Sequence, residues 1–157
     1  MSDEEPRRLV FYKEDIELIT NTLATFLKNA KARCVLLVDK DGHIVTREGE
    51  SSVDDMDTLS ALVAGSFAAT RQMARLVGEK EFSIMFQQRE KDNIQLSLVG
   101  ERTILAVIFD DPKTIGLVRL YAAQVSVKLT ELFKEIANRG RKGPDPFDGA
   151  GPTPAPA

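Results

Sequence analysis

Few side chains in this sequence have the type and spacing of an active site. His43 is the single histidine, and no motif places a serine or cysteine nucleophile and an acid around it. Cys34 is the single cysteine, which excludes an internal disulfide and a cysteine-rich zinc site. It opens an apolar run, where a small core residue is expected rather than a reactive thiol. Neither G-x-x-x-x-G-K-[ST] nor G-x-G-x-x-G occurs, so a glycine loop for nucleotide binding is not supported. We therefore expect no catalytic residue, no cofactor and no metal site.

Two groups of charged residues could still contact a ligand or partner. Asp54, Asp55 and Asp57 could hold a metal ion, but a cluster that caps the following helix explains them better. Arg71 and Arg75 lie one helical turn apart in the C-terminal half of that helix. They fit compensation of the helix dipole as well as contact with an acidic or phosphate-bearing partner. The sequence leaves both interpretations of the arginines open.

Composition excludes several classes of protein. The chain has 157 residues, a net charge of -3 and 43% hydrophobic residues, which predicts one globular domain with a real core. A nucleic-acid-binding domain usually carries a basic field, so no nucleic-acid partner is expected. The N-terminus is polar, and no apolar run approaches the length of a membrane span. We expect a cytoplasmic protein without membrane insertion.

Residues 57–77 predict a helix with two unlike faces, and the other elements are arranged around it. One face is apolar at helical spacing and is expected to be buried; it holds Leu59, Leu62, Val63, Phe67, Met73, Leu76 and Val77. The other is a strip of small residues, which predicts close packing of a partner; it holds Ser60, Ala61, Ala64, Gly65 and Ala68, followed by Gln72. The alternative is a helix buried on both sides within its own domain.

The remaining periodicity predicts helix, two strands, helix, three strands and helix. The elements are expected at residues 12–30, 34–38, 43–47, 57–77, 82–88, 94–98, 103–109 and 116–137. The most apolar strands, 34–38 and 103–109, should lie side by side in the middle of the sheet. Such an order favours a layered sandwich of the α+β type, with the first and last helices on one face and the middle helix on the other.

The two ends of the chain differ from its centre in composition. Residues 1–8 are polar and predict a flexible N-terminus. Residues 139–157 hold five of the seven prolines and four of the ten glycines, which predicts a disordered tail. The folded domain is therefore expected to span residues 9–138.

Four segments together carry a family resemblance. They are L-L-V-D-K-D-G-H-I-V (residues 36–45), D-T-L-S-A-L-V-A-G-S-F-A-A-T (57–70), T-I-L-A-V-I-F-D (103–110) and G-L-V-R-L (116–120). In this order the chain resembles the Roadblock (dynein light chain) family over roughly residues 10–138. The resemblance implies a Roadblock/profilin-like three-layer sandwich, with a mainly antiparallel five-stranded sheet of strand order 2-1-5-4-3. It also implies a homodimer whose edge strands pair and whose middle helices lie side by side.

The resemblance further implies a function in regulation. Bacterial polarity regulators of this family bind a Ras-like small GTPase of the MglA type and stimulate its GTP hydrolysis without inserting an arginine finger. Other members are scaffolds without such activity, so a non-catalytic dimerisation scaffold is the alternative. In this sequence the partner-binding residues are expected on the middle helix, at Ser60, Ala61, Ala64, Gly65, Ala68, Arg71, Gln72 and Arg75.

Overall fold

Helices and strands follow one another in the order that the sequence predicts. A computed structural model describes residues 11–51, 53–78, 83–86, 93–100 and 102–141. The elements are α1 (Lys13–Ala30), β1 (Cys34–Asp39), β2 (Ile44–Gly49), α2 (Met56–Val77), β3 (Ser83–Phe86), β4 (Asn93–Val99), β5 (Thr103–Phe109), a short 3-10 turn η1 (Pro112–Thr114) and α3 (Ile115–Arg141). The bounds of the other elements differ from the expected ones by a few residues, whereas residues 82, 87 and 88 of the strand expected at 82–88 lie outside the described residues.

The strands form one antiparallel sheet in the order β2-β1-β5-β4-β3. This is the order that the family resemblance implies. β1 and β5 are adjacent in the interior of the sheet, and β5 is buried along its whole length. Strands covered on both faces need apolar side chains at every position, which explains the two continuous apolar runs.

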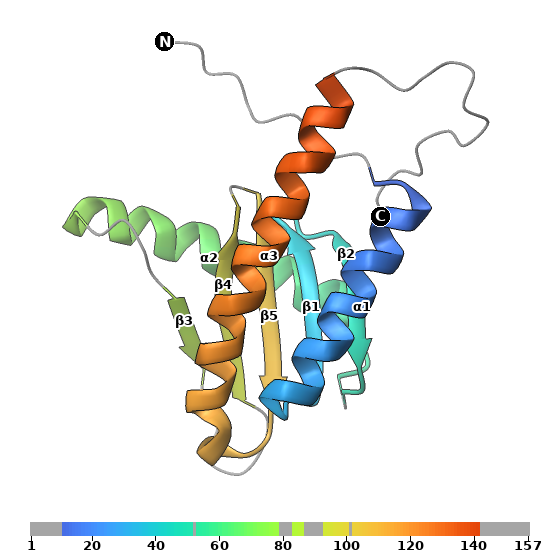
Figure 1. Ribbon diagram of the computed structural model, residues 1–157. Helices are drawn as coiled ribbons and strands as arrows, with labels where there is room; N and C mark the ends of the chain where they lie inside the picture. Colours follow the sequence, from blue (N-terminus) through green and yellow to red (C-terminus); the bar gives the residue numbers. More distant parts are fainter. Residues whose placement is uncertain (1–10, 52, 79–82, 87–92, 101, 142–157) are drawn as a thin grey trace.

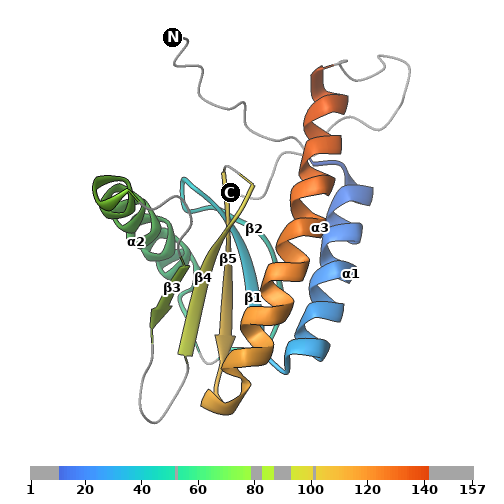
Figure 2. The ribbon, with the colours of Figure 1, turned by 60° about the vertical axis from the view of Figure 1, so that its left-hand side comes forward.

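Two layers of helices cover the two faces of the sheet (Figure 1). Side chains of a strand alternate between the faces, so Val35 and Leu37 pack with α1 and α3, whereas Cys34 and Leu36 pack with α2. Figure 2 shows α1 and α3 side by side on one side of the sheet and α2 alone on the other. The core thus consists of two apolar clusters separated by the sheet.

β4 differs from the expectation on one face. Gln95 and Ser97 alternate with Ile94, Leu96 and Leu98, a pattern that predicts a wet or partner-facing side. In the structure Leu96 packs towards α2, while Gln95 lies on the α3 side and is only 5% exposed. The expectation of a wet side is wrong because α3, which is far away in sequence, covers these polar side chains.

Local interactions fix the hairpin of β1 and β2. The Asp39 carboxylate accepts hydrogen bonds from the backbone N–H groups of Asp41 (2.9 Å) and His43 (3.0 Å), which closes the turn. After β2, Gly49 has a φ of +89° and passes so close to Arg33 that a Cβ would lie 2.1 Å from the Arg33 carbonyl oxygen. Only glycine fits this crossing.

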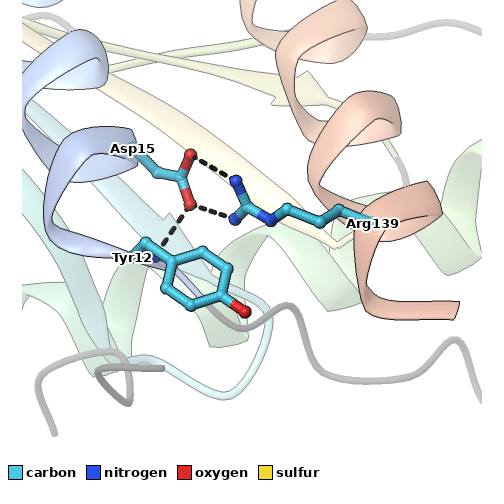
Figure 3. A network of polar contacts seen from close by, with 3 residues as sticks. All are labelled: Tyr12, Asp15 and Arg139. Carbon is cyan, nitrogen blue, oxygen red and sulfur yellow. Dashed lines mark hydrogen bonds and ion pairs between the residues drawn. The ribbon is translucent and has the colours of Figure 1, made fainter. Parts of the chain in front are cut away.

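α3 continues further than its sequence pattern predicts. It was expected to end at Ala137, but it extends to Arg141, so residues 139–141 are helical rather than part of a disordered tail. Arg139 forms a two-pronged ion pair with the Asp15 carboxylate and stacks over the Tyr12 ring, 4.0 Å from its centroid (Figure 3). Asp15 also accepts the Tyr12 backbone N–H at 2.7 Å. These contacts join the end of α3 to the start of α1. The flexible N-terminus and the rest of the predicted tail lie outside the described residues.

Candidate partner-binding site

α2 is a single helix with a well-defined start and end. The Asp55 carboxylate accepts the Thr58 backbone N–H (3.0 Å) and the Thr58 hydroxyl (2.6 Å), and these hydrogen bonds lower the pKa of Asp55. Gly78 ends the helix in the left-handed conformation, with φ of +82°. Asp55 is therefore a helix cap, which is the interpretation that the sequence favours. Among the described residues, no group of three or more potential metal ligands occurs.

The inner face of α2 includes two residues that were expected to bind a partner. The buried residues of the helix are Met56, Ser60, Val63, Ala64, Phe67 and Ala74. Ser60 is 1% exposed and Ala64 is 6% exposed, and Ala64 packs against the sheet with Val63 and Phe67. Their assignment to an outer strip is wrong. Small side chains at these positions let the helix approach the sheet closely rather than receive a partner.

The rest of the predicted strip lies on the surface. Exposed members are Ala61, Gly65, Ala68, Gln72 and Arg75, and Arg71 is half-buried. At about 100° per residue, the five exposed residues fall in one lane along the helix, which we call the small-residue lane. A Cβ added at Gly65 would meet no atom within 4 Å. The alternative that α2 is buried on both sides within its own domain is therefore wrong for this lane.

The structure has a second exposed lane on α2, which the sequence pattern did not predict. Four large apolar residues that were expected in the core are on the surface; they are Leu62 (63% exposed), Met73 (58%), Leu76 (87%) and Val77 (74%). Leu62, Ala69, Met73 and Leu76 share one side of the helix, which we call the apolar lane. It lies beside the small-residue lane, on a side of the helix distinct from that of Val63 and Phe67.

The position of α2 over the sheet explains why these apolar residues are exposed. Figure 1 shows the C-terminal half of α2 projecting past β3, beyond the sheet that covers its first half. Only Ala74 is buried after Phe67 in this helix. The clue present in the sequence was the spacing of residues 62, 69, 73 and 76, which defines an apolar side distinct from that of Val63 and Phe67.

The other candidate residues have structural roles. Cys34 is fully buried in β1, and this burial raises the pKa of its thiol, as expected for a core residue. The His43 imidazole lies beside the hairpin turn, with Nδ1 3.4 Å from an Asp39 carboxylate oxygen. Neither contributes to a nucleophile–base pair in the described contacts. Among the helices in the described ranges, none is long and apolar enough to cross a lipid bilayer.

Comparison with known proteins identifies the family. The Roadblock/LC7 domain family matches residues 18–109, which is more than half of the chain. The chain belongs to the Roadblock/LC7 family. The matched Roadblock segment runs from α1 to the end of β5 and includes all of α2. No match was found among curated protein sequences.

Solved structures of MglB proteins resemble this Roadblock chain closely. Myxococcus xanthus MglB is 36% identical and superposes with a TM-score of 0.73, over 82% of this chain and 96% of that one. A structure described as MglB with tetrameric arrangement is 28% identical, with a TM-score of 0.74 over 84% and 99% of the two chains. The gliding protein MglB from Thermus thermophilus is 29% identical, with a TM-score of 0.71 over 83% and 99%. Within its family, the chain is thus similar to MglB proteins over most of its length.

Proposed function

We propose that this chain is a cytoplasmic, non-enzymatic regulator of a Ras-like small GTPase of the MglA type, acting as a homodimer in bacterial cell polarity or motility. The observation that carries the proposal is the exposed apolar lane of α2. A surface row of large apolar side chains costs free energy in water and is typical of protein interfaces. The similarity to MglB proteins, one of which is described as a gliding protein, supports the choice of process.

In this proposal the two exposed lanes have different partners. The apolar lane pairs with the same lane of a second copy. A twofold axis brings the same surface of the two copies together, so each residue of the lane is buried in both copies. β3 lies at an edge of the sheet, where an unpaired strand edge favours pairing with a second chain. The small-residue lane is then left facing outward beside the dimer axis, where it offers a flat surface to the GTPase.

Stimulation of GTP hydrolysis would come from this surface as a whole. An inserted arginine finger contributes about 10³–10⁵ in rate in Ras-type systems. Arg71 and Arg75 project from the body of α2, and Arg71 is half-buried, so neither is on a loop that could reach the phosphates. We therefore assign these arginines to binding, and the rate effect to rearrangement of the GTPase's own loops.

Single-turnover hydrolysis with a purified MglA-type GTPase tests this assignment. Ala68→Arg should abolish binding while the homodimer remains, because Ala68 lies in the small-residue lane and is not a member of the apolar lane. Ala24→Arg, at an exposed position of α1, is the matched control and should bind normally. Ala64→Arg is not suitable for this test because its side chain would enter the core. Normal binding by Ala68→Arg would refute the platform.

The rate at saturating regulator separates the remaining alternatives. Arg71→Ala and Arg75→Ala should weaken binding modestly and keep the saturated rate. Normal binding with a loss of roughly 10³-fold in rate would establish a finger mechanism instead. If the unmodified protein binds the GTPase but does not change its rate, the chain is the non-catalytic scaffold that other family members exemplify.

A further inference from the structure

Two neighbouring polar side chains of β4 are buried on the α3 side of the sheet. Gln95 and Ser97 project from the same face of the strand as Val99, which belongs to the core cluster beneath α1 and α3. The Gln95 side chain is only 5% exposed. Its Oε1 and the Ser97 Oγ are both shielded from solvent, and neither atom has a hydrogen-bond partner within the described ranges. Buried polar atoms without partners are unfavourable and rare in folded proteins, so this pair needs an explanation.

The neighbouring strand β5 does not supply the partners. In the antiparallel register, Gln95 lies opposite Val107 and Ser97 lies opposite Leu105. Both β5 side chains are apolar and fully buried in the cluster beneath α1 and α3. The backbone N–H and C=O groups between the two strands bond to one another in the ladder. A partner for the two oxygen atoms must therefore lie above the sheet, towards α3.

α3 brings one further polar side chain to this place. It begins soon after β5, whose last residue pairs with Asn93 at the start of β4, and it reaches the end of β4 at Phe133, since a Cβ added at Gly100 would lie 4.0 Å from the Phe133 ring. α3 thus runs in the same direction as β4. Ser126 precedes Phe133 by about two turns, which puts it on the same side of the helix and about 10.5 Å back along it. About three strand residues span that length, so Ser126 lies level with Ser97.

The side chains that meet here leave room for a small ligand. Ala122 lies one turn before Ser126 on the helix, and Ser97 faces them from the strand. A water molecule can both donate and accept hydrogen bonds, and buried waters typically make about three of them to groups that otherwise lack partners. The Cα atoms of Gln95 and Ser97 are about 6.6 Å apart, as in any strand at this spacing. A water about 2.8 Å from each side-chain oxygen can bridge that interval.

We propose that one ordered water molecule binds between β4 and α3. It donates one hydrogen bond to the Gln95 Oε1, donates a second to the Ser126 Oγ and accepts one from the Ser97 hydroxyl. The water thereby satisfies both buried oxygen atoms and links the sheet to α3. The site lies on the face of the sheet opposite α2. The proposal therefore does not depend on the identity of the GTPase partner or on the dimer interface.

Oxygen-17 magnetic relaxation dispersion of the full-length protein tests the site in solution. The amplitude of the dispersion counts water molecules that stay bound for longer than the protein takes to tumble. Gln95→Met replaces the amide with an apolar chain of similar length, so the amplitude should fall by about one water molecule per chain. Gln124→Met is the matched control, because Gln124 is an exposed glutamine on α3, and it should leave the amplitude unchanged. An amplitude in Gln95→Met equal to that of the parent would overturn the proposal, as would an equal loss in Gln124→Met.

A crystal structure of the parent protein shows the contacts directly. Density for a water should lie about 2.7–3.2 Å from the Gln95 Oε1, the Ser97 Oγ and the Ser126 Oγ. The same peak should be missing from crystals of Gln95→Met, and thermal unfolding shows that this variant is folded. A direct hydrogen bond between Gln95 and Ser97, or between either residue and a side chain of α3, with no water density between them, would refute the site.

Discussion

Replacing Leu62 with glutamate should dissociate the proposed homodimer while leaving the fold intact. Complete burial of a leucine side chain contributes about 1.5–3 kcal/mol. Leu62 is 63% exposed in the single chain, so about 1–2 kcal/mol of this burial remains to be gained on association. A twofold dimer contains the residue twice, which makes about 2–4 kcal/mol per dimer. The loss corresponds to roughly a 30- to 700-fold weaker dimer, before repulsion between the two glutamates is added.

Leu62→Glu should lower the free energy of unfolding of the single chain only slightly. Only the buried remainder of Leu62 is lost, about 0.5–1 kcal/mol, and glutamate is a good helix former. Leu120→Glu is the matched control because Leu120 is a similarly exposed leucine (52%) on α3, away from α2. It should lose a similar amount of stability without weakening association.

Sedimentation velocity over a concentration series measures the association of the parent chain and of the two variants. The parent chain and Leu120→Glu should sediment as dimers at micromolar concentration, and Leu62→Glu should sediment near 17.4 kDa. Thermal unfolding shows whether each variant is folded. The apolar lane is not the dimer interface if folded Leu62→Glu dimerises as well as the parent, or if Leu120→Glu dissociates equally.

Three further predictions concern stability and can be measured by thermal or chemical unfolding. Asp15→Asn should lower the free energy of unfolding by about 1–2 kcal/mol, because it weakens charge-assisted hydrogen bonds between α1 and α3; Glu14→Gln, at an exposed neighbour, should have little effect. The lowered pKa of Asp55 stabilises the fold above its unfolded pKa of about 3.8, and this contribution is lost as pH falls through the lower folded pKa. Asp55→Asn should therefore show less destabilisation by acid in that range, and an unchanged pH dependence would contradict the capping role. Gly49→Ala should destabilise by at least 1–3 kcal/mol, roughly the cost of a strained backbone, whereas Gly65→Ala should stabilise by about 0.5–1 kcal/mol; similar effects of the two would contradict the crossing at Gly49.

Much of the fold could be predicted because its signals are local. The period of α1, the Asp-Gly turn after β1 and the apolar runs of β1 and β5 depend on residues close together in the sequence. The two most apolar strands were expected to be adjacent, and they are. Family resemblance supplied the strand order, which periodicity alone does not contain.

The end of α3 and the polar side of β4 could not be predicted in this way. Composition changes at Arg139, but Asp15, which is far away in sequence, forms an ion pair with this residue and joins the helix end to α1. Gln95 belongs to an alternating pattern that normally indicates a wet face, yet α3 covers it. In both cases a contact between distant segments overrides the local preference.

In the candidate site, too, some properties follow from the local sequence and others follow only from tertiary packing. The amino-acid sequence by itself determined that α2 is a helix, that it starts at the aspartate cluster and ends at Gly78, and that it has small and apolar sides. Only the tertiary structure decided which side faces the core. It buried Ser60 and Ala64 and left Leu62 and Leu76 in solvent. The physical reason is that periodicity sets the angle between residues on a helix, whereas the rotation of that helix and the length over which the sheet covers it depend on packing against β1 and β5.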